Sequence, residues 1–188
     1  MMNSCTLSKE KRDAVMCLHA FSGNDYLSAF FRKGKKTFWH IASKNIEFLS
    51  ALSCLGTSYE FSTDVKEMLQ KYVCAIYGKA KLSKVNLVRS KIFWDRYNKQ
   101  KKIVDLCMLP PCEGNLMLHI KRTNYVAYLS KHANELKPCL ELFSKHGWKD
   151  EAEAQWLEIY APQEIADLLN SSQETDEDFE QLYETEIS

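Results

Sequence analysis

The chain has 188 residues and an apolar fraction of 45%, but no apolar run near the roughly 18 residues that a membrane span requires. The sequence therefore predicts a globular body and no membrane partner. All 25 Lys and Arg residues lie within residues 1–150, which hold 13 acids and carry a net charge of +12. Residues 151–188 carry the other 12 acids and no Lys or Arg. A basic body of this kind attracts polyanions, so a plain mixed-charge surface is disfavoured.

The N-terminal residues and the cysteines both indicate an intracellular protein, in the nucleus or the cytoplasm. Five of the first 13 residues, those at positions 9–13, are charged, where a secretory signal would have an apolar run. The seven cysteines are odd in number and form no Cys-x-x-Cys pair, so reduced thiols are expected. A zinc site remains an alternative, although its spacing matches no standard module; its ligands would be Cys107, Cys112 and His119 with Cys139 or His146.

The first predicted element is a pair of short helices around a glycine hairpin, within residues 23–41. Gly23 permits backbone angles that larger residues resist, and Asp25 can cap a helix that begins near Tyr26. Gly34 then lets the backbone turn tightly, and the amides after it begin a second helix and point toward any phosphate nearby. Such a unit grips phosphate, with positive charge supplied by Arg32, Lys33, Lys35 and Lys36.

Apolar residues spaced three and four apart predict one helix after residue 64 and another after residue 83. Asp64 is the expected N-cap of the first helix, with Glu67 three residues later, and Gly78 ends it. Ser83 can cap the second helix, whose inward-facing residues would be Val85, Val88, Ile92 and Phe93.

The stretch 79–102 is the most basic part of the chain, with nine Lys and Arg residues and a single acid, Asp95. These side chains cannot all be buried, so much of the stretch must face water or a partner. Trp94 and Tyr97 lie among them, and aromatic residues beside basic ones suit base stacking, although they are as often core. The residues of this stretch expected to bind nucleic acid are Arg89, Lys91 and Arg96.

The remaining elements are two helices that begin at prolines and an acidic tail. Pro110 and Pro111 can start a helix that runs toward Leu129, and Pro162 can start a short one. No segment alternates apolar and polar residues long enough to predict a strand. The composition of residues 170–188 is acidic and polar, which predicts disorder. The sequence thus predicts an all-α helical array in three parts, residues 1–60, 61–169 and the tail.

The run GNDYLSAFFRKGKKTFW resembles the helix–three-turn–helix motif of flap endonucleases, whose usual form is Gly-Cys-Asp-Tyr, a short helix and Gly-Ile-Gly-Pro-Lys. Its Gly-x-Asp-Tyr element matches from Gly23, and the second glycine and the lysine of the hairpin match Gly34 and Lys36. Arg32 replaces the first hairpin glycine and Lys35 replaces the proline. The resemblance implies phosphate contact by Arg32, Lys33, Gly34, Lys35, Lys36 and Thr37.

The wider chain is similar to a family of repeat- and mobile-element-associated animal proteins that themselves resemble PIN and flap nucleases. The similarity covers roughly residues 15–170 and includes HAFSGNDYLSAFFRKGKKT, VCAIYG, LPPCEGNLMLHIKRTNYVAYL and HGWKDEAEAQW. It implies that Asp25 could be a metal ligand, because such nucleases hold two Mg²⁺ ions with a cluster of acids. The other acids would lie on an upstream α/β sheet, which is expected to be missing here. The chain is thus expected to need no cofactor of its own.

Three functions follow from these observations. The favoured one is a nucleic-acid-binding helical module, inactive alone, whose partner is duplex or branched DNA. The alternative is a protein-interaction module whose acidic tail docks on a protein partner through Phe179, Leu182 and Tyr183. A self-contained enzyme is the third, and no nucleophile–base set supports it among the five scattered histidines.

Overall fold

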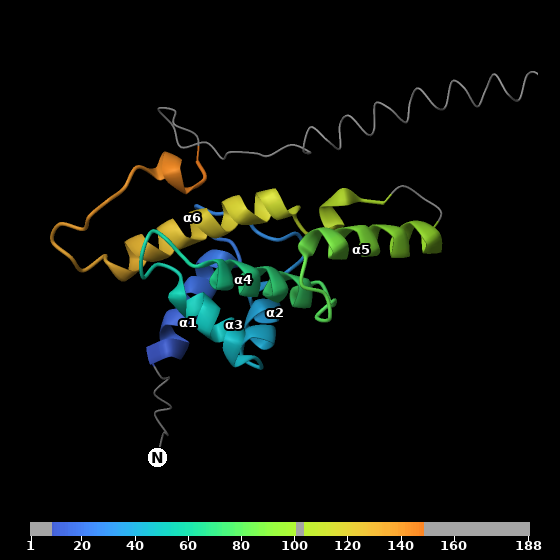
Figure 1. The fold of residues 1–188 in the computed structure, drawn as a ribbon, viewed down its shortest axis with the longest axis horizontal. Helices are drawn as coiled ribbons and strands as arrows, with labels where there is room; N and C mark the ends of the chain where they lie inside the picture. Colours follow the sequence, from blue (N-terminus) through green and yellow to red (C-terminus); the bar gives the residue numbers. More distant parts are fainter. Residues whose placement is uncertain (1–8, 101–103, 149–188) are drawn as a thin grey trace, which may run out of the picture. The chain divides into compact units, whose positions relative to one another are not determined.

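The protein is all-α, as the sequence predicts. The computed structural model describes residues 9–100 and 104–148, and within these ranges the regular structure is helical, with isolated β-bridge residues and no strand. The elements are α1 (Lys9–Phe21), α2 (Lys35–Ala42), α3 (Ile46–Cys54), α4 (Thr63–Ile76), α5 (Val85–Gln100), η1 (Leu106–Met108), α6 (Glu113–Lys131) and η2 (Phe143–His146), where η marks a 3₁₀ helix (Figure 1). All of them belong to one compact unit, Met1–Leu157. The short helix expected after Pro162 and the tail 170–188 lie outside the described residues.

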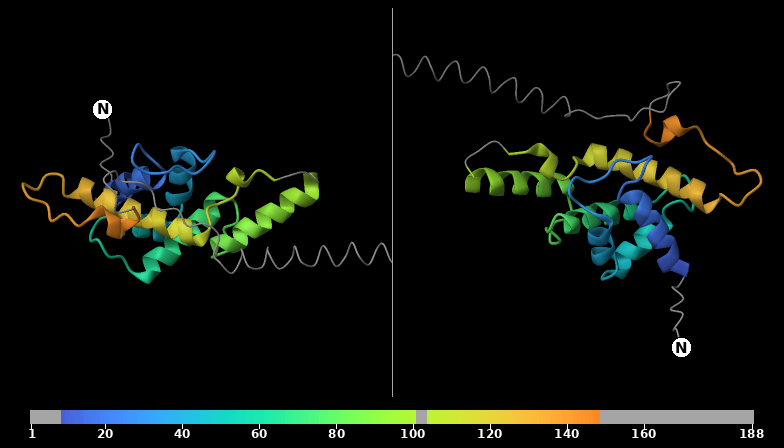
Figure 2. Two further views of the ribbon diagram at one scale, coloured as in Figure 1. Left: turned by 90° about the horizontal axis from the view of Figure 1, so that it is seen from above. Right: turned by 180° about the vertical axis from the view of Figure 1, so that it is seen from behind.

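The helices pack around α1, α3 and α4. α1 contacts α2, α3 and α6, while α4 contacts α2, α3 and α5. α6, the longest of the described helices, runs along one side of this group (Figures 1 and 2). α5 packs mainly on α4, and its C-terminal half projects beyond the other helices in all three views. Among residues 94–99 of α5, every side chain except that of Arg96 is exposed.

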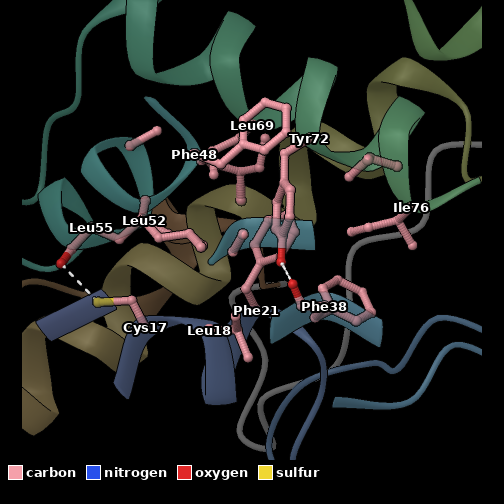
Figure 3. Packing of buried hydrophobic residues seen from close by; sticks show 14 of the residues in the cluster. Cys17, Leu18, Phe21, Phe38, Phe48, Leu52, Leu55, Leu69, Tyr72 and Ile76 are labelled. Atoms are coloured by element: carbon pink, nitrogen blue, oxygen red, sulfur yellow. Dashed lines mark hydrogen bonds between the residues drawn. The ribbon is translucent and has the colours of Figure 1, made fainter. Parts of the chain in front are cut away.

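Tyr72 of α4 lies at the centre of the main core (Figure 3). Its side chain is fully buried, and its ring centroid lies 6.0, 5.9 and 5.1 Å from those of Phe21, Phe38 and Phe48. Its hydroxyl donates to the carbonyl oxygen of Phe38 at 2.7 Å, and burial raises the pKa of the phenol. The cluster includes buried residues from each of the helices α1 to α6. The segments before and after residue 60 therefore contribute to one core.

Replacing Tyr72 by Phe should lower the free energy of unfolding by about 1 kcal/mol, because the ring still fills the core but one buried hydrogen bond is lost. Urea denaturation measures the change. Tyr97→Phe is the control, since Tyr97 is 47% exposed. Equal stability of Tyr72→Phe and Tyr97→Phe would contradict a stabilising role for the Tyr72 hydroxyl.

Two predicted helix caps are wrong, although the helices themselves are present. The N-cap of α4 is Ser62, whose hydroxyl accepts from the amide of Val65 at 3.3 Å, and not Asp64. The amide of Val85, at the start of α5, donates to the Gln70 side chain at 3.0 Å, and this partner lies on α4. Ser83 is therefore not needed there. Gly78, with a φ of 74°, ends α4 as predicted.

The helix expected to begin near Tyr26 does not form. Between α1 and α2 the backbone makes turns, with an isolated bridge between Asn24 and Leu27. The side chain of Asn24, not Asp25, accepts from the amide of Tyr26, at 2.9 Å. Leu27 and Phe30 are both buried, but in two different clusters. An irregular segment can reach both clusters, whereas a helix would place residues three apart on one face.

Candidate nucleic-acid interface

The Lys35 side chain caps the C-terminal end of α1. Its ammonium group donates to the carbonyl oxygens of Gly23 and His19 and to the hydroxyl of Ser22, the last two at 3.4 Å. A cation here satisfies carbonyls that the helix leaves open and lies at the negative end of the helix dipole. Lys35 therefore holds the segment 22–34 against α1. This role is one that the basic sequence pattern did not indicate.

The strained residue of the turn is Arg32, and not Gly34 as expected. Arg32 has a φ of 55°, in the left-handed region that side chains with a Cβ atom disfavour. Gly34 has an ordinary extended backbone, φ −85° and ψ 159°, and an added Cβ there would meet no atom within 4 Å. Gly23 does require its glycine, with a φ of 103°. The backbone turn thus places an arginine where a glycine would be least strained.

A pocket joins this turn to α5. Arg32 and Lys33 come from the turn, while Asp95 and Arg96 come from the C-terminal half of α5. The two basic segments singled out in the sequence therefore meet in space. We call this site the basic pocket; its lining consists of Phe31, Arg32, Lys33, Tyr77, Lys79, Ile92, Asp95, Arg96 and Met108.

The charges in the basic pocket are unbalanced. Lys79 pairs with Asp95 at 3.0 Å, which neutralises one cation. Across residues 9–100 and 104–148, Arg32, Lys33 and Arg96 form no ion pair with a carboxylate. The ammonium group of Lys33 lies 4.7 Å from the centre of the Tyr77 ring, and burial and then nearby Arg96 lower its pKa. An anion in the pocket would relieve the repulsion between Lys33 and Arg96.

The remaining predicted nucleic-acid ligands lie outside the basic pocket. Arg89 donates to the carbonyl oxygen of Pro110 at 2.6 Å, so its guanidinium group ties α5 to the start of α6. Lys36 and Thr37 are exposed in the first turn of α2, and Lys91 is exposed on α5. α2 has no side-chain cap at Gly34, which leaves first-turn amides available to a phosphate.

Asp25 is exposed and lies in a separate hollow, lined by Tyr26, Tyr125, Val126, Leu129, Ser130, Phe143 and Trp148. None of these neighbours is an acid, a histidine or a cysteine. In the part of the chain that the structure describes, no three such residues lie close enough to hold a metal ion. The predicted metal role of Asp25 and the zinc alternative therefore have no ligand set within the described residues.

The fold and the site define a class, an all-α protein with a basic pocket between a strained turn and a projecting helix. Comparison of the chain with protein-family models, with characterised proteins and with solved structures finds no match. None of the described helices combines the length and the apolar character needed to cross a lipid bilayer. Function must therefore be argued from the pocket itself.

Proposed function

We propose that this chain is a nucleic-acid-binding helical module that holds the phosphate backbone in the basic pocket. The observation that carries the proposal is the group of three cations there, Arg32, Lys33 and Arg96, without a carboxylate partner among the described residues. Two arginines and a lysine suit phosphate oxygens, because guanidinium groups can bind them in a bidentate manner and an ammonium group adds charge.

The backbone at Arg32 supports the same interpretation. A residue with a Cβ atom in the left-handed region costs of order 1 kcal/mol, so the fold tolerates strain at this position. Strained backbone occurs often at binding sites, where it aims a side chain. The guanidinium carbon of Arg32 lies 5.2 Å from the centre of the Phe31 ring, which restricts the side chain further.

Charge outside the pocket extends the proposed contact surface. Lys36 lies on the first turn of α2, two residues after Gly34, and Lys91 and Lys99 are exposed on α5. A backbone that enters the basic pocket could contact these lysines on either side. Such contacts release counterions and carry no base information, so binding should be sensitive to salt and largely blind to sequence.

Removing the three pocket cations should reduce the salt dependence of binding. We expect the full chain to bind a labelled 20-base-pair duplex in fluorescence anisotropy, with affinity that falls as salt rises. In Arg32→Gly/Lys33→Gln/Arg96→Gln, the slope of log affinity against log salt should fall by roughly 2 to 3, because each phosphate contact contributes about 0.9. Glycine is chosen at position 32 because it adopts the positive φ without strain. Lys35 is kept because it caps α1.

The matched control removes the same charge elsewhere. Lys71, Lys121 and Lys145 are exposed and do not line the basic pocket, so their joint replacement by Gln should change the slope much less. An equal loss in both triple variants would show that net charge and not the pocket drives binding. No binding of duplex or single-stranded DNA at low salt would overturn the proposal and favour a protein-interaction module.

A further inference from the structure

We infer that the aromatic cluster on α5 stacks unpaired bases, so that the preferred ligand is single-stranded nucleic acid or a single-stranded branch. The aromatic cluster consists of Phe93, Trp94 and Tyr97. This inference rests on the proposed phosphate-binding function and adds the class of ligand that the site selects. A duplex offers its backbone to the basic pocket but keeps its bases stacked on one another, away from these rings.

Trp94 and Tyr97 form an exposed aromatic platform on α5, and the half-buried Phe93 lies beside them. Trp94 is 55% and Tyr97 is 47% exposed, which is unusual for large aromatic side chains in a folded body. Their ring centroids lie 5.8 Å apart with planes at 88°, an edge-to-face arrangement. Phe93 lies nearly parallel to Tyr97, at 6.2 Å and 5°, and supports it from the half-buried side.

The platform adjoins the basic pocket along the same helix. Arg96 of the pocket follows Phe93 by three residues, and Lys91 precedes Trp94 by three, so cations lie beside the rings on both edges. A protein partner with an apolar surface would have to desolvate these charges. A single strand satisfies both features, because its phosphates meet the cations while its bases meet the rings.

The position of the cluster also explains why the other described residues do not cover the rings of Trp94 and Tyr97. α5 packs mainly on α4 through Val85 and Val88, which are fully buried, and its later turns project beyond the other helices (Figure 1). Among the described residues, the rings are therefore supported on one side and face solvent on the other. Base stacking on such rings tolerates any base, because every base has a flat π face.

The test compares one single strand and one duplex on the full chain. Fluorescence anisotropy with labelled oligo(dT) of 20 nucleotides and with a 20-base-pair duplex, at equal low salt, should give the tighter affinity for the single strand. Trp94→Ala should weaken single-strand binding roughly 5- to 150-fold, the range that stacking of one base supplies. Duplex affinity and the single-strand salt slope should stay unchanged, since the ring carries no charge.

Two further variants separate stacking from structural damage. Trp94→Phe keeps a stacking ring and should retain most of the single-strand affinity. Leu87→Ala removes another exposed apolar side chain of α5, 58% exposed, and should have no effect on either ligand. Circular dichroism melting of each variant checks that the helices are intact.

The outcomes distinguish the inference from the proposed function. If the pocket triple variant loses affinity for both ligands but Trp94→Ala binds oligo(dT) like the wild type, stacking is refuted and phosphate binding stands. Wild-type preference for the duplex, or equal losses for both ligands in Trp94→Ala, would likewise refute stacking. If the wild type binds neither ligand, the proposed function fails and the inference fails with it.

Discussion

Replacing Gly56 by Ala should lower the free energy of unfolding by about 3 to 5 kcal/mol, through backbone strain and overpacking together. Gly56 has a φ of 74°, and a Cβ built there would lie 2.5 Å from the carbonyl carbon of Ala127 and 2.6 Å from the amide nitrogen of Tyr128. Both atoms belong to the backbone of α6, which cannot move aside as a flexible side chain would. Thermal melting should show a decrease of about 10 °C or more.

The loop after α3 cannot move away from α6, because the side chain of Asn124 on α6 is hydrogen-bonded to its backbone. The side chain of Asn124 is 1% exposed, and its oxygen accepts from the amide of Gly56 at 2.8 Å. Its amide group donates to the carbonyl oxygens of Ser58 and Tyr59, at 2.8 and 2.9 Å. Relaxation of a bulkier residue 56 would therefore break buried hydrogen bonds as well.

Gly78→Ala is the matched control for this prediction. Gly78 has the same φ, 74°, but an added Cβ would meet no atom within 4 Å. It should cost about 1 to 2 kcal/mol, the strain of the left-handed backbone alone. Equal melting temperatures of the two variants would contradict the close approach of residue 56 to α6.

The helices that the sequence predicted are those marked by an apolar repeat or by a glycine or proline at one end. α4 and α6 have the expected extent because Gly78 and the proline pair before residue 112 interrupt the chain. α1 and α3 were missed although they carry usable signals. Ala14, Cys17 and Phe21 of α1 repeat with helical spacing and are fully buried, and Asn45 caps α3 with its side chain. These two helices could have been found by the same reasoning.

The helix predicted near Tyr26 is absent because the local sequence pattern does not determine the backbone conformation of that segment. Tyr26, near which the helix was expected to begin, is 73% exposed. Leu27 packs with Ala20 and Trp148, and Trp148 lies far along the chain. Contacts of this range are invisible in a window of ten residues, so tertiary packing overrides the helical spacing.

The sequence could predict that the site is basic, but it could not predict which basic residues line the pocket. Arg32, Lys33 and Arg96 were all named from charge, yet nothing in the sequence says that the turn and α5 meet. Lys35 and Arg89 were named for the same reason and are instead bonded to backbone carbonyl oxygens. Which lysine caps a helix and which faces a ligand depends on partners distant in sequence.

His119 should make the fold sensitive to acid between about pH 6.5 and pH 4. This histidine of α6 is 4% exposed and lies edge-on to the rings of Phe21 and Phe30, at 5.2 and 5.1 Å. Burial, and to a smaller extent nearby Arg122, lower its pKa to about 4, against an opposing effect of its hydrogen bond to Phe21. Burial disfavours the charged imidazolium, so the folded protein keeps this ring neutral.

The neutral ring connects α6 to the segment that carries the basic pocket. Its Nε2 lies 2.7 Å from the carbonyl oxygen of Phe21, which cannot donate, so Nε2 carries the proton. Nδ1 then accepts from the Ser28 hydroxyl at 3.2 Å. His119 thus fixes both the end of α1 and the turn segment before Arg32. Loss of this contact in acid should loosen the pocket along with the fold.

The sign of the pH effect follows from which state binds the proton. In the unfolded chain the histidine titrates near its ordinary value of 6.5, and in the folded chain near 4. Between these values the unfolded state holds more protons, so the free energy of unfolding falls as the pH falls. The full difference corresponds to roughly 3 kcal/mol, and it should level off below pH 4.

Urea denaturation at several pH values between 7.5 and 4 tests this prediction. The quantity to compare is the slope of the free energy of unfolding against pH, and not the absolute stability. His119→Gln is expected to be less stable at pH 7.5, because glutamine fills the site poorly, but its stability should change much less from pH 6.5 to pH 4. His40→Gln is the control, since His40 is exposed and should leave the wild-type slope intact. The carboxylates that titrate below pH 5 are common to all three proteins and cancel in the comparison. A His119→Gln protein with the full wild-type slope would place the acid sensitivity elsewhere in the chain.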